Sequence, residues 1–165
     1  MYLTALLSIA LLSGPSASAP QAKPAEKPAA QAAKPAAGGA RVVEITGADD
    51  MKYSVTTIDA KPGETLRIKL TNKGTLPKIA MAHNFVLLKL GAKQIDFANA
   101  AALARATDFI PPDMKDQVLA ASTLTGPGET AEVTVKVPSA AGSYPFLCSF
   151  PGHFAAGMRG NIVVK

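Results

Sequence analysis

A short stretch near the C-terminus carries three side chains that bind metals through different donor groups. Cys148 is the only cysteine of the chain, His153 is one of two histidines, and Met158 follows in the same stretch. The second histidine is His83, within Met81-Ala-His-Asn-Phe-Val86. A thiolate, two imidazoles and a thioether are the ligand set of a mononuclear copper site with three strong planar donors and a long axial thioether contact. Such a site suits an ion that alternates between Cu(I) and Cu(II).

Each of these side chains also has an ordinary structural interpretation. A lone cysteine is most often a small buried apolar residue, and a methionine before a terminal strand usually fills the core. Their coincidence within eleven residues favours a metal site instead. Gly152 and Gly157 each directly precede a proposed ligand, and Pro151 stiffens the same loop. This composition is expected of a short turn that directs two side chains to one point.

Two segments resemble the ligand-bearing stretches of the cupredoxin family of blue copper proteins, in particular its azurin and auracyanin members. They are Leu76-Pro-Lys-Ile-Ala-Met-Ala-His-Asn-Phe-Val-Leu87 and Cys148-Ser-Phe-Pro-Gly-His153. A weaker similarity extends over residues 41–165. The resemblance implies one copper ion per chain, with the ligands His83, Cys148, His153 and Met158.

The resemblance also assigns roles to the neighbours of the ligands. Three residues are expected to support the ligands without binding copper: Asn84, Ser149 and Phe150. In the family, the asparagine joins the two ligand segments through hydrogen bonds. Supporting contacts of this kind orient the ligands of a metal.

The sequence departs from the azurins at three points. Four residues separate His153 from Met158, where azurins have three, and this spacing is more like that of auracyanin and plastocyanin. Ala82 stands where azurins have a glycine whose carbonyl is a weak axial ligand, so a contact of the Ala82 carbonyl with copper stays open. The disulfide of azurins cannot form, because the chain has a single cysteine.

Around His153 the resemblance implies an apolar surface through which electrons leave by the imidazole edge. The residues assigned to this partner-docking patch are Met51, Leu76, Ala80, Phe154 and Ala155. A small apolar patch allows fast and weak docking. For Phe154, packing in the core is the alternative.

The favoured function is therefore a monomeric one-electron carrier outside the cytoplasm. Its expected partners are redox proteins such as c-type cytochromes or membrane electron-transfer complexes. The alternative is a periplasmic copper carrier or chaperone, but Met51, Met81 and Met114 form no methionine-rich cluster. We do not expect an enzyme, because copper oxidases and nitrite reductases need further histidines and His83 and His153 are the only two. A metal-free adhesion-like sandwich would leave the ligand set unexplained.

Before the expected domain, the chain has two segments of different composition. An apolar run from Leu3 to Leu12, followed by small residues, predicts a signal peptide over residues 1–19 and a periplasmic or otherwise secreted protein. An N-terminus that stays in the membrane as a tether is the alternative. Residues 20–40 contain no aliphatic side chain larger than alanine and predict a linker, which leaves residues 41–165 as the domain.

The charge of the chain argues against a nucleic-acid partner. The formal net charge is +5, and it falls to +3 for residues 41–165, because the first forty residues hold three lysines and one glutamate. The basic residues are spread among the expected strands and are not interleaved with aromatic residues. A solvated surface of ordinary charge is the better interpretation.

Short β-rich segments separated by turn residues must position the ligands. The predicted strands are Val42–Thr46, Ser54–Ile58, Thr65–Thr71, His83–Lys89, Gln117–Ser122, Ala131–Val137, Ser143–Cys148 and Asn161–Lys165. About eight strands with one-sided apolar alternation predict an all-β, cupredoxin-like Greek-key sandwich. One inserted helix is predicted over residues 94–107, with Ile95, Ala98, Ala102 and Leu103 on one face and Pro111-Pro112 ending it.

Overall fold

The structure, a computed structural model, describes residues 39–165. The predicted signal peptide lies outside these residues, as does the predicted linker apart from its last two positions. Within residues 39–165, no helix has both the length and the apolar character needed to cross a membrane.

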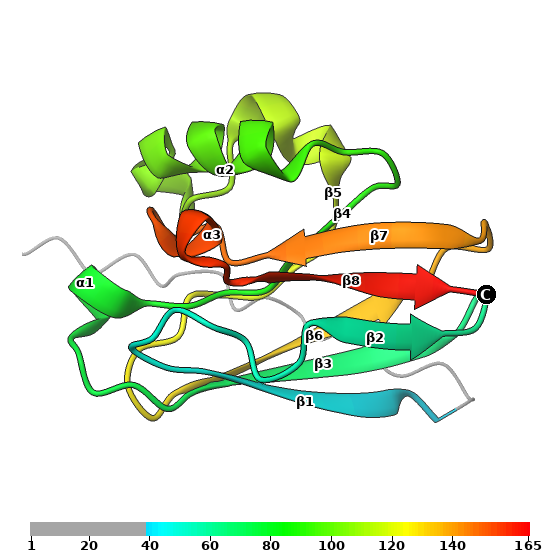
Figure 1. The fold of residues 1–165 in the computed structure, drawn as a ribbon, viewed down its shortest axis with the longest axis horizontal. Helices are drawn as coiled ribbons and strands as arrows, with labels where there is room; N and C mark the ends of the chain where they lie inside the picture. Colours follow the sequence, from blue (N-terminus) through cyan, green and yellow to red (C-terminus); the bar gives the residue numbers. More distant parts are fainter. Residues whose placement is uncertain (1–38) are drawn as a thin grey trace, which may run out of the picture. The chain divides into compact units, whose positions relative to one another are not determined.

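In the described part of the chain, eight strands form two sheets, as the sequence predicted (Figure 1). The three-stranded sheet has the order β1 (Arg41–Gly47), β3 (Thr65–Asn72), β6 (Thr130–Lys136). The five-stranded sheet has the order β2 (Thr57–Ala60), β8 (Arg159–Val164), β7 (Gly142–Leu147), β4 (Val86–Leu88), β5 (Val118–Ala121). The pairs β1–β3 and β2–β8 are parallel, and the others are antiparallel.

The main core lies between the two sheets. In β3 the side chains of Leu66, Ile68 and Leu70 are fully buried, while the alternating Arg67 and Lys69 point away from the core. This alternation follows from the two-residue period of a strand. Phe146 from the other sheet joins the same apolar cluster. The copper-ligand candidates Cys148 and Met158 belong to this cluster too, so the site is built into the core.

A second apolar layer covers the outer face of the five-stranded sheet, where α2 (Gln94–Leu103) lies (Figure 1). Strand β4 is buried on both sides, because Leu87 faces the sandwich core and Val86 faces the helix layer. The helix contributes Phe97 and Ala101, both fully buried. Strand β4, which follows the His83 segment, is thus enclosed by packing on both faces.

The apolar face predicted for α2 is not the one that is buried, although Ala98 of the predicted set packs at the edge of the helix layer. Ile95 and Leu103 are 51% and 89% exposed, and Phe97 with Ala101 faces the sheet instead. Phe97 carries the one aromatic ring of an otherwise alanine-rich helix, and burying this ring against the sheet fixes the rotation of the helix.

The helical content also exceeds the single predicted helix. Helix α2 ends at Leu103, a 3-10 turn follows at Arg105–Thr107, and Pro112 begins a second 3-10 helix, Pro112–Gln117, rather than stopping one. Proline is well suited to a first turn, because the missing N–H would have no helical partner there. Two four-residue helices, α1 (Lys78–Met81) and α3 (His153–Ala156), are too short for apolar periodicity to reveal.

Candidate metal centre

Cys148 and Met158 bracket a short loop at one end of the sandwich. Strand β7 ends at Leu147, one residue earlier than predicted, and the Cys148 N–H then donates to the Met158 carbonyl at 3.0 Å. This bond holds the two ends of the loop together. Helices α1 and α3 lie at the same end, opposite the C-terminus (Figure 1).

Helix α3 carries His153 at its first position, so the loop is more ordered than the sequence indicated. It begins after Gly152 and ends before Gly157, with φ of 84° and 103° at these two residues. Such left-handed backbone is readily adopted by glycine alone, which explains why the helix has a glycine at both ends. The two turns direct the His153 ring inward, where the residue is 2% exposed.

The strand predicted to begin at His83 begins only at Val86, the first residue of β4. His83 forms instead an isolated bridge with Thr125. The His83 N–H donates to the Thr125 carbonyl at 3.0 Å, and the Thr125 N–H and hydroxyl donate to the His83 carbonyl at 2.7 and 2.9 Å. Both backbone groups of His83 are therefore bound, which fixes the direction of its side chain.

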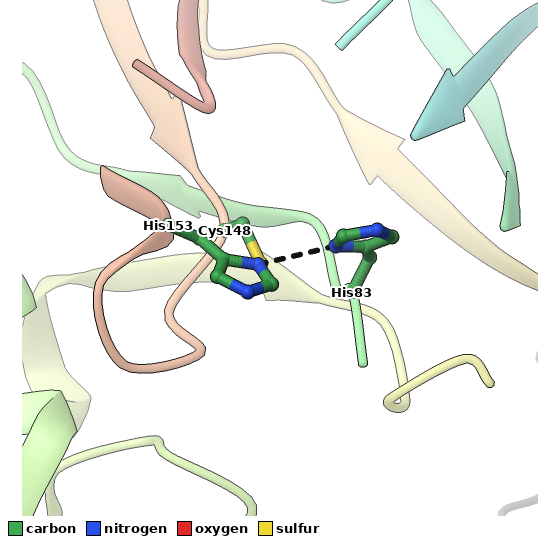
Figure 2. A group of neighbouring side chains, drawn as sticks. All are labelled: His83, Cys148 and His153. Atoms are coloured by element: carbon green, nitrogen blue, oxygen red, sulfur yellow. Dashed lines mark hydrogen bonds between the residues drawn. The ribbon is translucent and has the colours of Figure 1, made fainter. Parts of the chain in front are cut away.

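The three strong donors converge in the core. The Nδ1 atoms of His83 and His153 are 3.1 Å apart, and Cys148 Sγ lies 3.4 Å from Nδ1 of His153. All three ligand atoms lie within 4.8 Å of one another, and each residue is at most 2% exposed. Figure 2 shows the side chains facing one another, with the Nδ1 contact dashed. Metal–imidazole bonds are about 2.0–2.1 Å, so one ion can reach both nitrogens at this separation.

Burial makes the metal-free donors neutral. It raises the pKa of the Cys148 thiol to about 12, although the backbone N–H groups of Asn84 and Phe150 oppose this shift. Burial, with a smaller contribution from the charge of His83, lowers the pKa of His153 to about 4. The pKa of His83 is also lowered, chiefly by burial. At neutral pH the imidazole lone pairs are free to bind a cation, and a bound cation replaces the thiol proton.

The surroundings of the His83 ring are also consistent with a metal ligand. The Nε2 atom of His83 is buried and forms no hydrogen bond within residues 39–165. The Ala48 carbonyl, a backbone acceptor near the ring, opposes the fall in the His83 pKa. The other ring nitrogen of His83, Nδ1, points to Nδ1 of His153, so the ring is directed toward the other donors.

Two further residues named from the sequence lie at the edge of the donor group. The Ala82 carbonyl oxygen is 4.0 Å from Cys148 Sγ, so it faces the site. Met158 is fully buried, and both its terminal methyl and the His83 ring lie close to Gly47. A Cβ at position 47 would come within 2.5 Å of Met158 Cε. Glycine at the end of β1 therefore makes room for the thioether and the imidazole.

The side chains of Asn84 and Ser149 connect the two ligand segments directly. Asn84 Nδ2 donates to Ser149 Oγ at 2.8 Å, and Ser149 N–H donates to Asn84 Oδ1 at 2.9 Å. Phe150 lies half-buried beside them, with its ring centroid 4.8 Å from that of His153. These are the three residues expected to support the ligands, and all of them contact the site or its supporting segments.

The residues assigned to the docking patch differ in exposure. Leu76 is 44% exposed, Ala80 and Ala155 are exposed, and Met51 is half-buried. Phe154 is only 7% exposed and packs in the layer beneath α2, with the Arg159 guanidinium 4.7 Å above its ring. Phe154 therefore packs in the core, which was the alternative interpretation of this residue.

Sequence reasoning missed several residues that hold the site. Gly47 and Thr125 act as described above, and buried Asn72 donates to the carbonyls of Met81 and Thr125 at 3.2 and 3.0 Å. A glycine within a strand pattern signals close backbone approach, so Gly47 was detectable. Asn72 and Thr125 carried no such signal, because their partners are distant in sequence.

An eight-stranded sandwich with two imidazoles and a thiol gathered at one end defines the cupredoxin class of blue copper proteins. A family model described as copper binding proteins, plastocyanin/azurin family, matches residues 40–165. The chain belongs to this family. Family and site together support a blue copper electron-transfer protein with copper as its cofactor.

Individual relatives agree with the family match. The chain is 34% identical to auracyanin-B of Chloroflexus aurantiacus over 87% of its own length and 63% of the relative's. It is 37% identical to azurin of Pseudomonas chlororaphis, over 74% of its own length and 97% of the relative's. The solved auracyanin A of Chloroflexus aurantiacus gives a TM-score of 0.67 at 32% identity, covering 77% of this chain and 100% of that one.

Proposed function

We propose that this protein is an extracytoplasmic carrier that passes single electrons between redox partners. The observation that supports this most directly is the buried convergence of two imidazole nitrogens and one thiol sulfur at the end of a rigid sandwich. Copper supplies the one-electron couple when bound there. The chain's own contribution is to hold the donors in a geometry that serves both oxidation states.

The residues that would hold copper are His83, Cys148 and His153, with the Met158 thioether as a weaker donor. Whether the Ala82 carbonyl, 4.0 Å from Cys148 Sγ, also contacts the ion stays open. Hydrogen bonds of Thr125 hold the His83 backbone. The Cys148–Met158 backbone bond holds the loop. Because these contacts are made by the protein alone, the site is organised before metal binds.

For the docking of partners we propose the surface formed by Leu76, Ala80 and Ala155, with half-buried Met51 at its edge. Phe154, the residue of α3 before Ala155, anchors this helix by packing in the layer beneath α2. Ala155 lies on the same short helix as His153, so a partner seated there approaches the imidazole. Small apolar contacts of this kind suit transient complexes. The partners proposed are c-type cytochromes or membrane electron-transfer complexes outside the cytoplasm.

A copper carrier must release its ion to another protein through accessible ligands. The three donors here are at most 2% exposed. Burial slows ligand exchange and favours an ion that stays while electrons move, so we prefer the electron carrier.

Copper reconstitution of the purified full-length chain tests the proposal. Adding one equivalent of Cu(II) should produce intense visible absorption from thiolate-to-copper charge transfer, and Cys148→Ser should abolish it. The colour should bleach on reduction and return on oxidation over repeated cycles in the presence of a copper chelator. Colour retained by Cys148→Ser would refute the thiolate assignment, and rapid loss of copper to the chelator would favour the carrier function.

A further inference from the structure

Tyr53 brings a contact to the ligand segment from a part of the chain that contributes no donor. It lies between β1 and β2, is 5% exposed, and packs its ring 5.6 Å from that of Phe146 in the main core. Its hydroxyl donates to the Asn84 carbonyl. Asn84 directly follows His83, so this hydrogen bond acts one residue away from a donor to copper.

The surrounding backbone shows what the hydroxyl contributes. His83 has both backbone groups bound to Thr125. The Phe85 N–H donates to Ser122 Oγ at 2.9 Å, and the Phe85 carbonyl accepts from the Ser122 N–H at 2.9 Å. The carbonyl between these two residues, that of Asn84, is satisfied by Tyr53. Tyr53 therefore completes the pairing of a buried segment whose side chain at Asn84 also binds Ser149.

We propose that Tyr53 is a positioning residue for the copper site. By holding the Asn84 carbonyl, it sets the orientation of the segment that presents His83 and the separation of that segment from the Cys148 loop. Without the hydroxyl, a buried acceptor loses its partner and the segment must shift or admit water. A looser segment lets the oxidised ion draw its ligands toward the tetragonal geometry that Cu(II) prefers.

Two consequences follow, and only the second rests on the proposed function. In the metal-free protein, loss of the hydroxyl should increase local opening around residues 83–85. In the copper-loaded protein, it should lower the reduction potential, enlarge the copper hyperfine splitting in the EPR spectrum, and slow electron self-exchange. The last effect arises because the ligands then move more between oxidation states.

The test compares Tyr53→Phe with Tyr144→Phe. Tyr144 is also buried, at 3% exposure, and its hydroxyl donates to the Ala140 carbonyl at 2.9 Å beside the β6–β7 turn, at the opposite end of the sandwich. Both variants remove one hydroxyl that serves one backbone carbonyl. The loss of a tyrosine hydroxyl as such is therefore common to both variants, and a change confined to Tyr53→Phe reports on the His83 segment.

Amide hydrogen exchange of the metal-free proteins comes first. We expect exchange at His83, Phe85 and Ser149 to accelerate by about tenfold in Tyr53→Phe relative to Tyr144→Phe. The copper-loaded variants are then compared by EPR, voltammetry and self-exchange, with changes expected in Tyr53→Phe alone. Equal changes in both variants, or none in either, would overturn the proposal. If the unmodified chain bound copper without the blue absorption, the proposed function would fail, while the exchange measurement would still decide the role of Tyr53.

Discussion

Asn84 and Ser149 exchange two hydrogen bonds, and each of these residues is the next one after a copper-ligand candidate. The distances are 2.8 Å from Asn84 Nδ2 to Ser149 Oγ and 2.9 Å from Ser149 N to Asn84 Oδ1. Both residues are at most 2% exposed. Because the pair is reciprocal and buried, it sets the separation of the His83 and Cys148 segments without help from a metal.

Removal of this pair should be costly. We expect Asn84→Ala to lower the free energy of unfolding of the metal-free protein by about 2–4 kcal/mol, because the N–H and hydroxyl of Ser149 lose buried partners. Urea denaturation measures this change, and a copper titration should show weaker binding. Asn161→Ala, at an exposed position of β8, is the control. Equal stability of the two variants would contradict the linking role.

Met158 should tune the copper site more than it holds the ion. We expect Met158→Leu to keep copper and to have a higher reduction potential, because loss of the thioether donor costs the oxidised ion more. The two side chains have similar volumes, so the loss of stability should stay below about 1.5 kcal/mol. Voltammetry and a copper assay measure the outcome. A variant that no longer retains copper would show that Met158 is a main ligand.

Gly47 should be intolerant of any side chain. In Gly47→Ala the new Cβ would lie 2.5 Å from Met158 Cε and 3.0 Å from His83 Cδ2. Displacement of these groups should cost about 1–3 kcal/mol of stability and alter the copper EPR spectrum. Gly39→Ala is a matched control, since a Cβ there meets no atom within 4 Å. An unaltered spectrum in Gly47→Ala would mean that the thioether does not approach copper from this side.

Copper binding should release about one proton per ion near neutral pH. The thiol of Cys148 is protonated in the metal-free protein because its pKa is raised to about 12, whereas His153, with a pKa lowered to about 4, is already neutral. Copper replaces the thiol proton, so the apparent affinity should rise with pH by about tenfold per unit. Calorimetry in buffers of different ionisation enthalpy counts the protons. Binding without proton release would imply a preformed thiolate.

A charge on the proposed docking surface should slow electron exchange without changing the copper site. We expect Ala155→Asp to slow self-exchange by about tenfold, which corresponds to an added cost of about 1.4 kcal/mol for desolvating the carboxylate. Ala140→Asp places the same charge at an exposed position by the β6–β7 turn, at the other end of the sandwich. NMR line broadening in mixtures of the two oxidation states measures the rate. Equal slowing in both variants would indicate long-range repulsion rather than contact.

Much of the architecture was predictable, because the alternation of apolar and polar residues along the sequence indicates strands. Alternation in Leu66-Arg-Ile-Lys-Leu70 predicted β3, and that strand spans Thr65–Asn72. The predicted strand from Ser54 begins only at Thr57, and the face of α2 was wrong. Strand ends and the rotation of a helix depend on which distant side chains fill the core, so local periodicity does not determine them.

The sequence by itself determined the chemistry of the site, since the types and spacing of Cys148, His153 and Met158 restrict the metal and its redox role. Only the tertiary structure decided how His83 reaches them, through its bridge to Thr125. It also decided that Gly47 lies against Met158 and His83 and that Tyr53 binds the carbonyl of Asn84, the residue after His83. Donor chemistry belongs to each side chain separately. Distances, burial and the shifted pKa values arise from packing between segments that are far apart in the chain.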